Sequence, residues 1–482
     1  MRRVLLSAVA LCALAVVSAE RRIPAPTPGP FGGLEEFIAS KGDQKARRKA
    51  WFAEMRRAPP GVDVDAVEEH NGLDQIARRN GLAEAPPSTE GSWVERGSDN
   101  QAGRMHVARV TADGTKLYAG SSRGGVWKSD PDGTSWEPIG DNLYGGAHWL
   151  EVLETDSGRR VVAATDGGLI HHSDDEGVTW VAPSGQPEAM SWIHRLLMTS
   201  DGSQTLYVVL DASRMYRSAD AGSTFVQRKL VDHDYWGSLN AGVVDAELVA
   251  YGGIELHVSR DGGQSASKKN NWWAYYTAYG GDEDIYLHAD IMGIDVRPEG
   301  DGEVWYVDTD GGLYTSTDSL ATVHNLSLDG LRASQYYDVH TSWNNPDRVL
   351  AGAQDQGWQV TAYATQDADE PLEFYQLVSG DYGHITSGDN SHDLVYTTYP
   401  GFVLIQHDED NPWTEGVSFP ADESYVPWIP PVLADPLEPT AFFFPATRLY
   451  RATEDSGWTY EAYSPDFQLA DGEMVRSARV TS

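Results

Sequence analysis

Short apolar segments that alternate with glycine-rich turns recur along most of this chain. One pair of segments lies between Lys116 and Ser129, and a similar pair lies between Trp305 and Ser316, each interrupted by a Gly-Gly turn. Apolar runs of four to eight residues that are bounded by glycine are typical of β-strands. We count eight such units, whose first strands begin near residues 106, 150, 193, 239, 292, 336, 384 and 428.

A short phrase of the form S/T-x-D-x-G-x-T-aromatic ends several of these units. Full copies begin at Ser173, Ser218 and Thr453, and weaker copies begin at Ser129, Ser259 and Ser316. In such a turn the Asp side chain accepts hydrogen bonds from nearby backbone N–H groups, the glycine supplies an unusual backbone angle, and the aromatic residue anchors the next strand. We therefore interpret five acids as structural: Asp175, Asp220, Asp261, Asp318 and Asp455. In the copy at Ser129, Pro131 stands where the aspartate is expected.

Units that recur about every 45 residues predict an all-β fold, a β-propeller of four-stranded blades. The repeated phrase resembles that of the Asp-box (BNR-repeat) proteins, a superfamily of β-propellers. The superfamily includes sialidases, xyloglucanase-type glycoside hydrolases, sortilin-type receptors and a plant photosystem assembly factor. The order of His288-Ala289-Asp290, Gln354-Asp355-Gln356-Gly357 and Gly380-Asp381-Tyr382-Gly383 is similar to that in secreted bacterial propellers related to sortilin.

The N-terminal region differs from the repeats. Residues 1–19 have the charged start, apolar run and small-residue end of a signal peptide, and residues 20–91 form a Pro-rich linker followed by helical sequence. Amphipathic patterns predict two helices, over residues 34–58 and 63–83. We expect the basic stretch from Lys45 to Arg57 to lie against an acidic propeller over residues 92–482.

The two ends of the repeat region suggest how the propeller closes. Residues 92–100 parallel residues 135–142, an outer-strand sequence, while residues 477–482 echo the inner strand near residue 106. Strands contributed by both ends would remove an exposed sheet edge. We therefore expect a single ring whose last blade is incomplete.

Charge and cysteine content exclude several classes of partner. The chain has 36 Lys+Arg and 72 Asp+Glu, for a net charge of −36, and the excess of acids lies after residue 91. Such a surface repels phosphate, so nucleic acid and anionic membranes are disfavoured as partners. The only cysteine, Cys12, lies in the predicted signal peptide, and no later run reaches the length of a membrane helix. The sequence thus predicts a secreted or periplasmic protein of bacterial type, without disulfides or membrane insertion.

Candidate functional residues lie on the face opposite the Asp-box turns. In a blade, the connection between the second and third strands and the connection from one blade to the next share that face. The residues expected there are His288, Asp290, Asp310, Gln354, Asp355, Asp381, His384, Trp149, Trp192 and Trp236.

These residues suit more than one function. Aromatic rings stack on sugars or peptide side chains and carboxylates accept hydroxyl or ammonium donors, which favours a scaffold that binds glycan, peptide or protein ligands. The alternative is a glycoside hydrolase that uses two carboxyls among Asp290, Asp310, Asp355 and Asp381. The acidic balance disfavours a sialidase, whose substrate is an anion. We expect no metal or other cofactor, with calcium as the remaining option.

Overall fold

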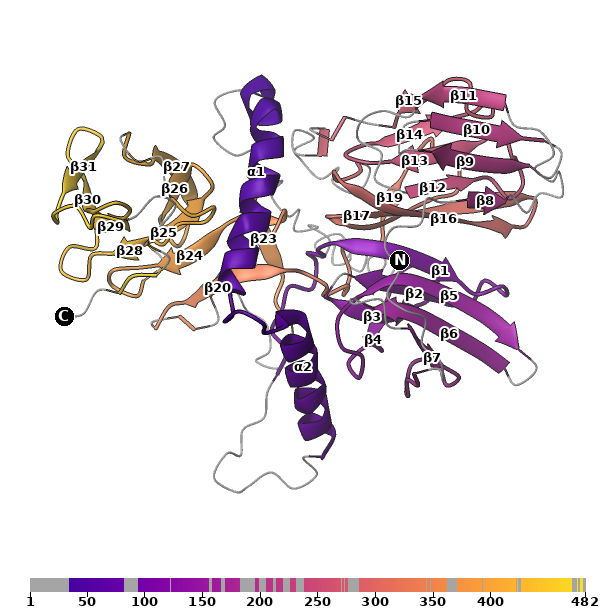
Figure 1. Cartoon of the computed structure of the whole chain (residues 1–482), viewed down its shortest axis with the longest axis horizontal. Coiled ribbons are helices and arrows are strands. Elements are labelled where there is room, and N and C mark those ends of the chain that lie inside the picture. The colour runs from indigo at the N-terminus through magenta and orange to yellow at the C-terminus, as the bar shows by residue number, and fades with distance from the viewer. Residues whose placement is uncertain are drawn as a thin grey trace, which may run out of the picture.

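The computed structural model describes residues 34–81 and 94–479, apart from residues 122, 156–157, 166–169, 183–195, 199–204, 211–213, 220–225, 231–237, 270, 273, 276–285, 344, 347, 362–370, 392, 422, 424–425, 470–474 and 476. Two helices precede 31 strands in this part of the chain (Figure 1). The predicted signal peptide lies outside the described residues.

The strands form eight antiparallel sheets, and their first strands begin close to the eight predicted positions. The first four sheets comprise β1 (Met105–Val110), β2 (Leu117–Ser121), β3 (Gly125–Ser129) and β4 (Trp136–Pro138); β5 (Ala147–Thr155), β6 (Gly158–Thr165) and β7 (Ile170–Ser173); β8 (Leu196–Met198), β9 (Leu206–Leu210), β10 (Arg214–Ser218) and β11 (Val226–Leu230); and β12 (Ser238–Ala241), β13 (Val249–Gly252), β14 (Leu256–Ser259) and β15 (Ser267–Lys268).

The last four sheets comprise β16 (Ile291–Glu299), β17 (Gly302–Thr309), β18 (Gly312–Ser316) and β19 (His324–Asn325); β20 (Tyr336–Thr341), β21 (Val349–Ala353), β22 (Gly357–Thr361) and β23 (Phe374–Val378); β24 (Gly383–Thr386), β25 (Leu394–Tyr399), β26 (Phe402–His407) and β27 (Trp413–Ser418); and β28 (Leu433–Ala434), β29 (Ala441–Pro445), β30 (Leu449–Glu454) and β31 (Trp458–Ala462). The strands of each sheet follow one another in space as in sequence. This confirms the predicted fold, a β-propeller built from blade-like sheets.

Several second and third strands are almost wholly buried, which explains their continuous apolar sequence. Every residue of β2 and β22 is buried, and so are all but the first residue of β17. Side chains from adjacent sheets then share a core, as Trp305 of β17 does with residues of β13 and β14. The large aromatic residues of the repeats therefore form the packing between blades.

The Asp-box turns lie between the third and fourth strands. Asp175 accepts the Thr179 backbone N–H at 2.8 Å and the Thr179 hydroxyl at 2.6 Å, and Asp261 and Asp318 accept the corresponding bonds from Ser265 and Thr322. In the copy at Ser129 the acid is Asp130, one position earlier than the pattern expects, and it accepts the backbone N–H of Thr134 at 3.1 Å.

Two members of the Asp-box set differ from the rest. Asp220 lies outside the described residues. At Asp455, no hydrogen bond to the carboxylate is found in the described part of its turn, where Gly457 (φ 130°) directly joins β30 to β31.

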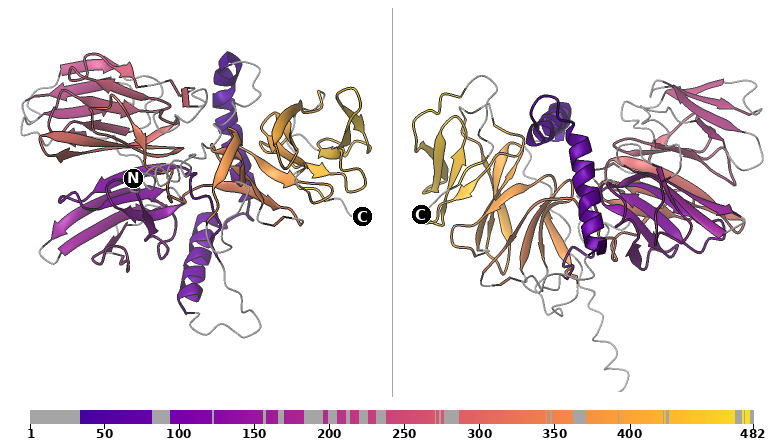
Figure 2. Two further views of the ribbon diagram at one scale, coloured as in Figure 1. Left: turned by 180° about the vertical axis from the view of Figure 1, so that it is seen from behind. Right: turned by 60° about the horizontal axis from the view of Figure 1, so that its bottom comes forward.

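The sheets do not form the single ring that we expected. Inner strand β1 packs against β5 and also against β16, so the first sheet adjoins both the second and the fifth. In one ring of eight, the fifth blade would instead lie across the axis from the first. We call β1–β19 the first sheet group and β20–β31 the second; the two groups lie on opposite sides of helix α1 in both views of Figure 2.

The expected closure by both chain ends is also wrong. Residues 477–479 are in no strand, and the segment before β1 joins the sixth sheet instead. Ser98 forms a parallel bridge with Leu372, and the Asn100 side chain donates to the Phe374 carbonyl (3.1 Å) and accepts its N–H (2.9 Å). The buried Asn100 amide thus fastens this segment to β23 of the sixth sheet rather than to a blade shared with the C-terminus.

The two predicted helices are present. Helix α1 (Leu34–Met55) lies between the two sheet groups, and α2 (Val64–Gly81) begins at Asp63, whose carboxylate caps the Ala66 N–H at 3.1 Å (Figure 1). Helix α2 contacts the loop after β4, where Asn80 donates to Asn142 at 2.8 Å. Neither helix has the length and apolar character of a membrane span in the part of the chain described.

Candidate functional site

Four acids predicted from the sequence lie in connections at the same end of their sheets. Asp290 precedes β16 and Asp310 lies in the turn between β17 and β18, while Asp355 lies between β21 and β22 and Asp381 precedes β24. The Asp-box turn at Asp318 follows the far end of β18. The candidate acids therefore occupy the end of the sheets away from the Asp-box turns.

Sheet geometry brings Asp355 and Asp381 to the same place. The Gly357 N–H donates to the Gly380 carbonyl at 2.9 Å, and Gln356 and Gly380 form a parallel bridge. The chain that enters the seventh sheet therefore runs directly beside the turn of the sixth. Gly357 (φ 75°) permits this approach, because a Cβ at this position would collide with the Val378 carbonyl.

Arg104, which immediately precedes β1, links the first sheet to acids of both sheet groups. Its Nε and Nη2 atoms donate to both oxygens of Asp310, the second at 2.5 Å, and Nη2 lies 3.3 Å from Asp355 Oδ2. The Asp310 side chain is 1% exposed and the Asp355 side chain 21%. A buried carboxylate needs such a partner, because an unpaired buried charge is strongly destabilising.

Sequence reasoning missed Arg104. A single arginine forms no motif, although its place before an inner strand puts it on the same end of the sheets as the candidate acids. The available signal was a basic residue, rare in this acidic propeller, at the end of the sheets where the candidate acids lie.

The pKa values of these acids are driven apart by their surroundings. Burial raises the pKa of Asp381 to about 7, with a further rise from the charge of Asp355. Burial also raises the pKa of Asp310, whereas the charge of Arg104 and its hydrogen bonds to both Asp310 oxygens favour the ionised form. Burial also opposes ionisation of Asp355, but the Arg104 and Arg48 guanidiniums outweigh it and hold its pKa below the ordinary value. The cluster therefore combines the ionised Asp355 with Asp381, a carboxyl that holds a proton near neutral pH, while Asp310 is paired with Arg104 through both of its oxygens.

Aromatic side chains adjoin the acids of the second sheet group. The Tyr337 hydroxyl donates to Asp381 Oδ1 at 3.1 Å, and its ring centroid lies 5.9 Å from that of Trp428. Burial raises the pKa of Tyr337 well above its ordinary value, so the phenol remains a hydrogen-bond donor. We call Tyr337, Asp355, Asp381 and Trp428 the acidic-aromatic surface.

Helix α1 covers this surface. Arg48 Nη1 lies 4.0 Å from Asp355 Oδ1, and its guanidinium carbon lies 5.9 Å from the Trp428 ring centroid. The Trp51 ring lies 5.9 Å from Trp428 and 6.2 Å from Tyr337. The basic stretch of the helix therefore lies against acids, as the charge distribution suggested, but at the candidate site itself.

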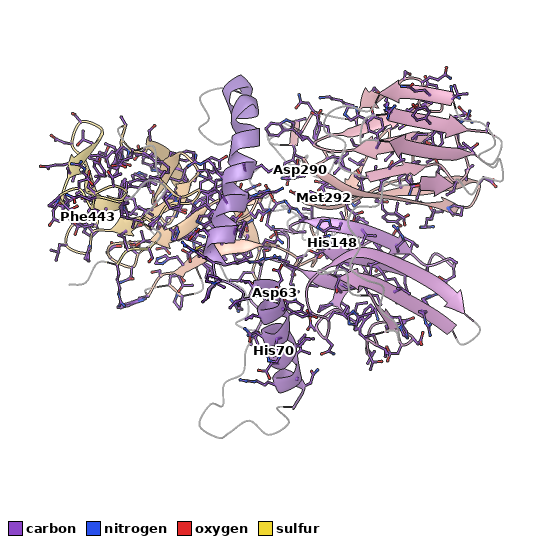
Figure 3. All side chains as sticks on the ribbon, in the orientation of Figure 1. Asp63, His70, His148, Asp290, Met292 and Phe443 are labelled. Carbon is purple, nitrogen blue, oxygen red and sulfur yellow. The ribbon has the colours of Figure 1, made fainter. Side chains whose placement is uncertain are left out.

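The remaining predicted residues divide by position. His288 is buried, with Nδ1 3.0 Å from the Ala289 carbonyl and its ring edge-on to Tyr275. A charge on His288 favours a lower pKa of Asp355. Gln354 donates to Asp355 Oδ2 at 3.0 Å. Figure 3 shows Asp290 on the side of the first sheet group that faces α1.

Other predicted residues do not join this group. Burial lowers the pKa of His384, and the charge that opposes this effect belongs to Asp338 rather than to the clustered acids. Trp192 and Trp236 lie outside the described residues, as does the side chain of Trp149.

Three of the residues predicted from the sequence have left-handed backbone angles that side chains other than glycine avoid. They are Asp290 (φ 68°), Asp355 (φ 61°) and His384 (φ 56°). Such conformations cost on the order of 1–3 kcal/mol each and cluster at functional sites in proteins.

No group of three or more His, Cys, Asp or Glu side chains with metal-binding geometry occurs among the residues that the structure describes. The acids of the cluster are instead partnered by arginines. The calcium option therefore remains a prediction.

Comparisons with known proteins found no matching family model and no matching curated protein. Among solved structures, a GH74 enzyme of Niastella koreensis matches 75% of this chain at 16% identity, with a TM-score of 0.38, and the chain spans 56% of that enzyme's length. PorZ, a surface component of the type-IX secretion system of Porphyromonas gingivalis, matches 75% of this chain at 13% identity over 47% of its own length, with a TM-score of 0.30. YCF48 bound to a D1 peptide matches 56% of this chain at 16% identity over 82% of its own length, with a TM-score of 0.21.

Proposed function

We propose that this chain is an exported, ligand-binding β-propeller whose site is the acidic-aromatic surface. The observation that carries the proposal is the convergence of Asp355 and Asp381 beside the rings of Tyr337 and Trp428. Aromatic faces hold the apolar faces of sugars or the side chains of peptides, and carboxylates accept hydroxyl, ammonium or guanidinium donors. The signal peptide predicted from residues 1–19 supports an activity outside the cytoplasm.

The ligand class that fits the site best is a peptide or protein segment with a positive charge and an aromatic group. Asp355 is ionised and already holds two arginines, Arg104 and Arg48. The net charge of −36 also attracts cations over long range. A neutral glycan, held by stacking and by hydroxyl hydrogen bonds, is the second ligand class that this chemistry accepts.

The second candidate function is glycoside hydrolysis, and one observation favours it. An acid of raised pKa beside an ionised carboxylate is the arrangement that general acid–base catalysis requires. Asp381, with a pKa of about 7, would protonate the leaving oxygen, and Asp355 would act as the base or nucleophile.

The test compares binding with hydrolysis. The full chain, Asp355→Asn and Asp381→Asn would be screened on a glycan array, a library of cationic peptides and a panel of polysaccharides. Asp301→Asn, in the exposed turn between β16 and β17, is the matched control. For a binding protein we expect Asp355→Asn to weaken ligand binding at least tenfold, in the range of a lost charge-assisted hydrogen bond, and no polysaccharide to be cut. Hydrolysis that both site variants abolish while binding persists would replace the proposal with the enzyme.

A further inference from the structure

Helix α1 contacts the candidate site with a small number of side chains. Figure 1 shows the helix crossing between the two sheet groups, where Arg48, Trp51 and Phe52 meet the acidic-aromatic surface. Arg48 and Trp51 are three residues apart, so they share one face of the helix. Arg47, next to Arg48, donates to the Val426 carbonyl at 3.3 Å.

The propeller does not need α1 to complete its cores. Among residues 45–55, the part of the helix whose side chains the structure describes, none belongs to a hydrophobic cluster and none is fully buried. A helix held by its tertiary contacts alone, outside every core, behaves as a docked ligand that is joined to its receptor by chain.

Charge is complementary across the contact. Residues 45–57 contain six basic side chains and one acid, Glu54. Burial opposes the charge of Arg48, yet the carboxylates of Asp355 and Asp381 raise the pKa of Arg48 above its ordinary value. In the docked helix, the Arg48 guanidinium therefore interacts with two acidic side chains and the face of Trp428 in place of water.

One polar group of the surface is still unsatisfied when α1 is in place. Trp428 is buried, with 4% of its surface exposed, and its indole N–H has no hydrogen-bond partner among the described residues. A buried donor without a partner is costly and rare in native proteins. A ligand with an acceptor near this nitrogen would therefore make a bond that α1 does not make.

We propose that the acidic-aromatic surface is a receptor for an amphipathic helix that presents an arginine and a tryptophan three residues apart, and that α1 occupies this receptor as a tethered competitor. The partner is a segment of another protein or peptide with this chemistry, and it binds by displacing α1. This inference rests on the proposed function, because it names the ligand class of the same site.

The tether sets the strength of the competition. A segment joined to its receptor by its own chain can act at an effective concentration of about millimolar. An external helix of similar affinity therefore binds the intact chain weakly, because α1 competes for the same surface. When α1 is released, the apparent affinity of the external helix rises to the value that it has for the uncovered surface.

The test uses a fluorescein-labelled peptide of residues 44–58 as the probe and the full-length chain as the receptor. The receptor variant Arg48→Ala/Trp51→Ala releases α1 from the surface without changing the surface. Arg57→Ala is the control, since the Arg57 side chain is 73% exposed and pairs with Glu54 near the end of α1. We expect the double variant to bind the peptide about tenfold or more tightly than the unaltered chain and the control.

Two further measurements make the test specific. Asp355→Asn in the double-variant background should lose the gain, and a peptide that carries Arg48→Ala/Trp51→Ala should bind none of the receptors. Hydrogen exchange of residues 45–57 should accelerate in the double variant while exchange in β25 and β26 is unchanged, which shows that the propeller is folded.

Equal affinity of the peptide for the double variant and the unaltered chain would overturn the inference, as would an absence of peptide binding to a folded double variant. If the peptide fails in this way while Asp355→Asn still abolishes binding of a glycan or another peptide, the proposed function stands and the tethered-competitor inference alone is wrong. If Asp355→Asn affects no ligand at all, the proposed function fails as well.

Discussion

Individual aspartates in this protein have opposite roles, and their surroundings decide which. Asp175, Asp261 and Asp318 are at least partly exposed and accept hydrogen bonds from their own turns. The bonds from Ser265 are the main reason that the pKa of Asp261 falls to about 2. Asp381 is buried next to another carboxylate, which raises its pKa to about 7. The same residue type therefore stabilises a turn in its charged form at one end of a sheet and holds a proton at the other.

The first prediction concerns the Asp-box turn at Asp261. A lowered pKa means that this acid contributes stability above the unfolded value of about 4 and loses that contribution as the pH falls through about 2. We expect Asp261→Asn to lower the free energy of unfolding by about 1 kcal/mol at pH 7, because the carboxylate is partly exposed to solvent. Urea unfolding of this variant and Asp301→Asn at pH 7 and pH 3 measures the difference, which should be smaller at pH 3.

The second prediction concerns Asp381, for which the sign is reversed. Its raised pKa means that the folded chain binds a proton that the unfolded chain releases, so this acid costs stability as the pH rises from about 4 through about 7. A change of one pKa unit corresponds to about 1.4 kcal/mol, so we expect a decline on the order of a few kcal/mol across this range. Asp381→Asn should flatten the profile of unfolding free energy between pH 5 and pH 8. A variant profile as steep as that of the unaltered chain would contradict the assignment.

At the scale of elements, the repeats were predictable because each sheet is formed by strands that are adjacent in sequence. The turn, glycine and aromatic signals that define a blade lie within about 45 residues, so all eight units could be located from the sequence. The shift of the acid to Asp130 in one turn shows the limit of a fixed pattern, since Pro131 lacks both the carboxylate and the N–H. Arg104 had no such signal, because its partners Asp310 and Asp355 lie more than 200 residues away in sequence.

The third prediction concerns the elements that Arg104 connects. Arg104→Leu leaves Asp310 buried without a cation, and breaking a buried pair by removing one partner costs about 3–5 kcal/mol. We expect a loss of stability of that order in denaturant unfolding. Adding Asp310→Asn should recover part of the loss, because the remaining side chain is neutral. A double variant no more stable than the single one would show that Arg104 acts through other contacts.

At the scale of the whole molecule, local patterns did not determine how the sheets associate. Sequence order predicted one ring, whereas β1 packs against both β5 and β16, and this choice depends on which buried faces fit each other. Residues 92–100 resemble an outer strand in sequence, but the described part of this segment forms only one parallel bridge, from Ser98 to Leu372 next to the sixth sheet. The candidate site follows from this association, since Arg104 and Asp310 belong to the first sheet group and Asp355 and Asp381 to the second.

The last prediction concerns Asn100, which holds the segment before β1 to the second sheet group. Its buried amide both donates to and accepts from the backbone of Phe374, and Leu372 and Phe374 are buried beside it. Asn100→Ala removes both bonds and leaves a buried N–H and carbonyl without partners, at a cost of about 2–4 kcal/mol. Because this segment continues into Arg104, we expect the variant to loosen the two sheet groups relative to each other. Small-angle scattering should show a larger radius of gyration, and binding at the acidic-aromatic surface should weaken, while Asn345→Ala, an exposed amide on the second group, changes neither. An Asn100→Ala protein with unchanged scattering and binding would mean that the helix and the buried ion pairs alone hold the two groups in place.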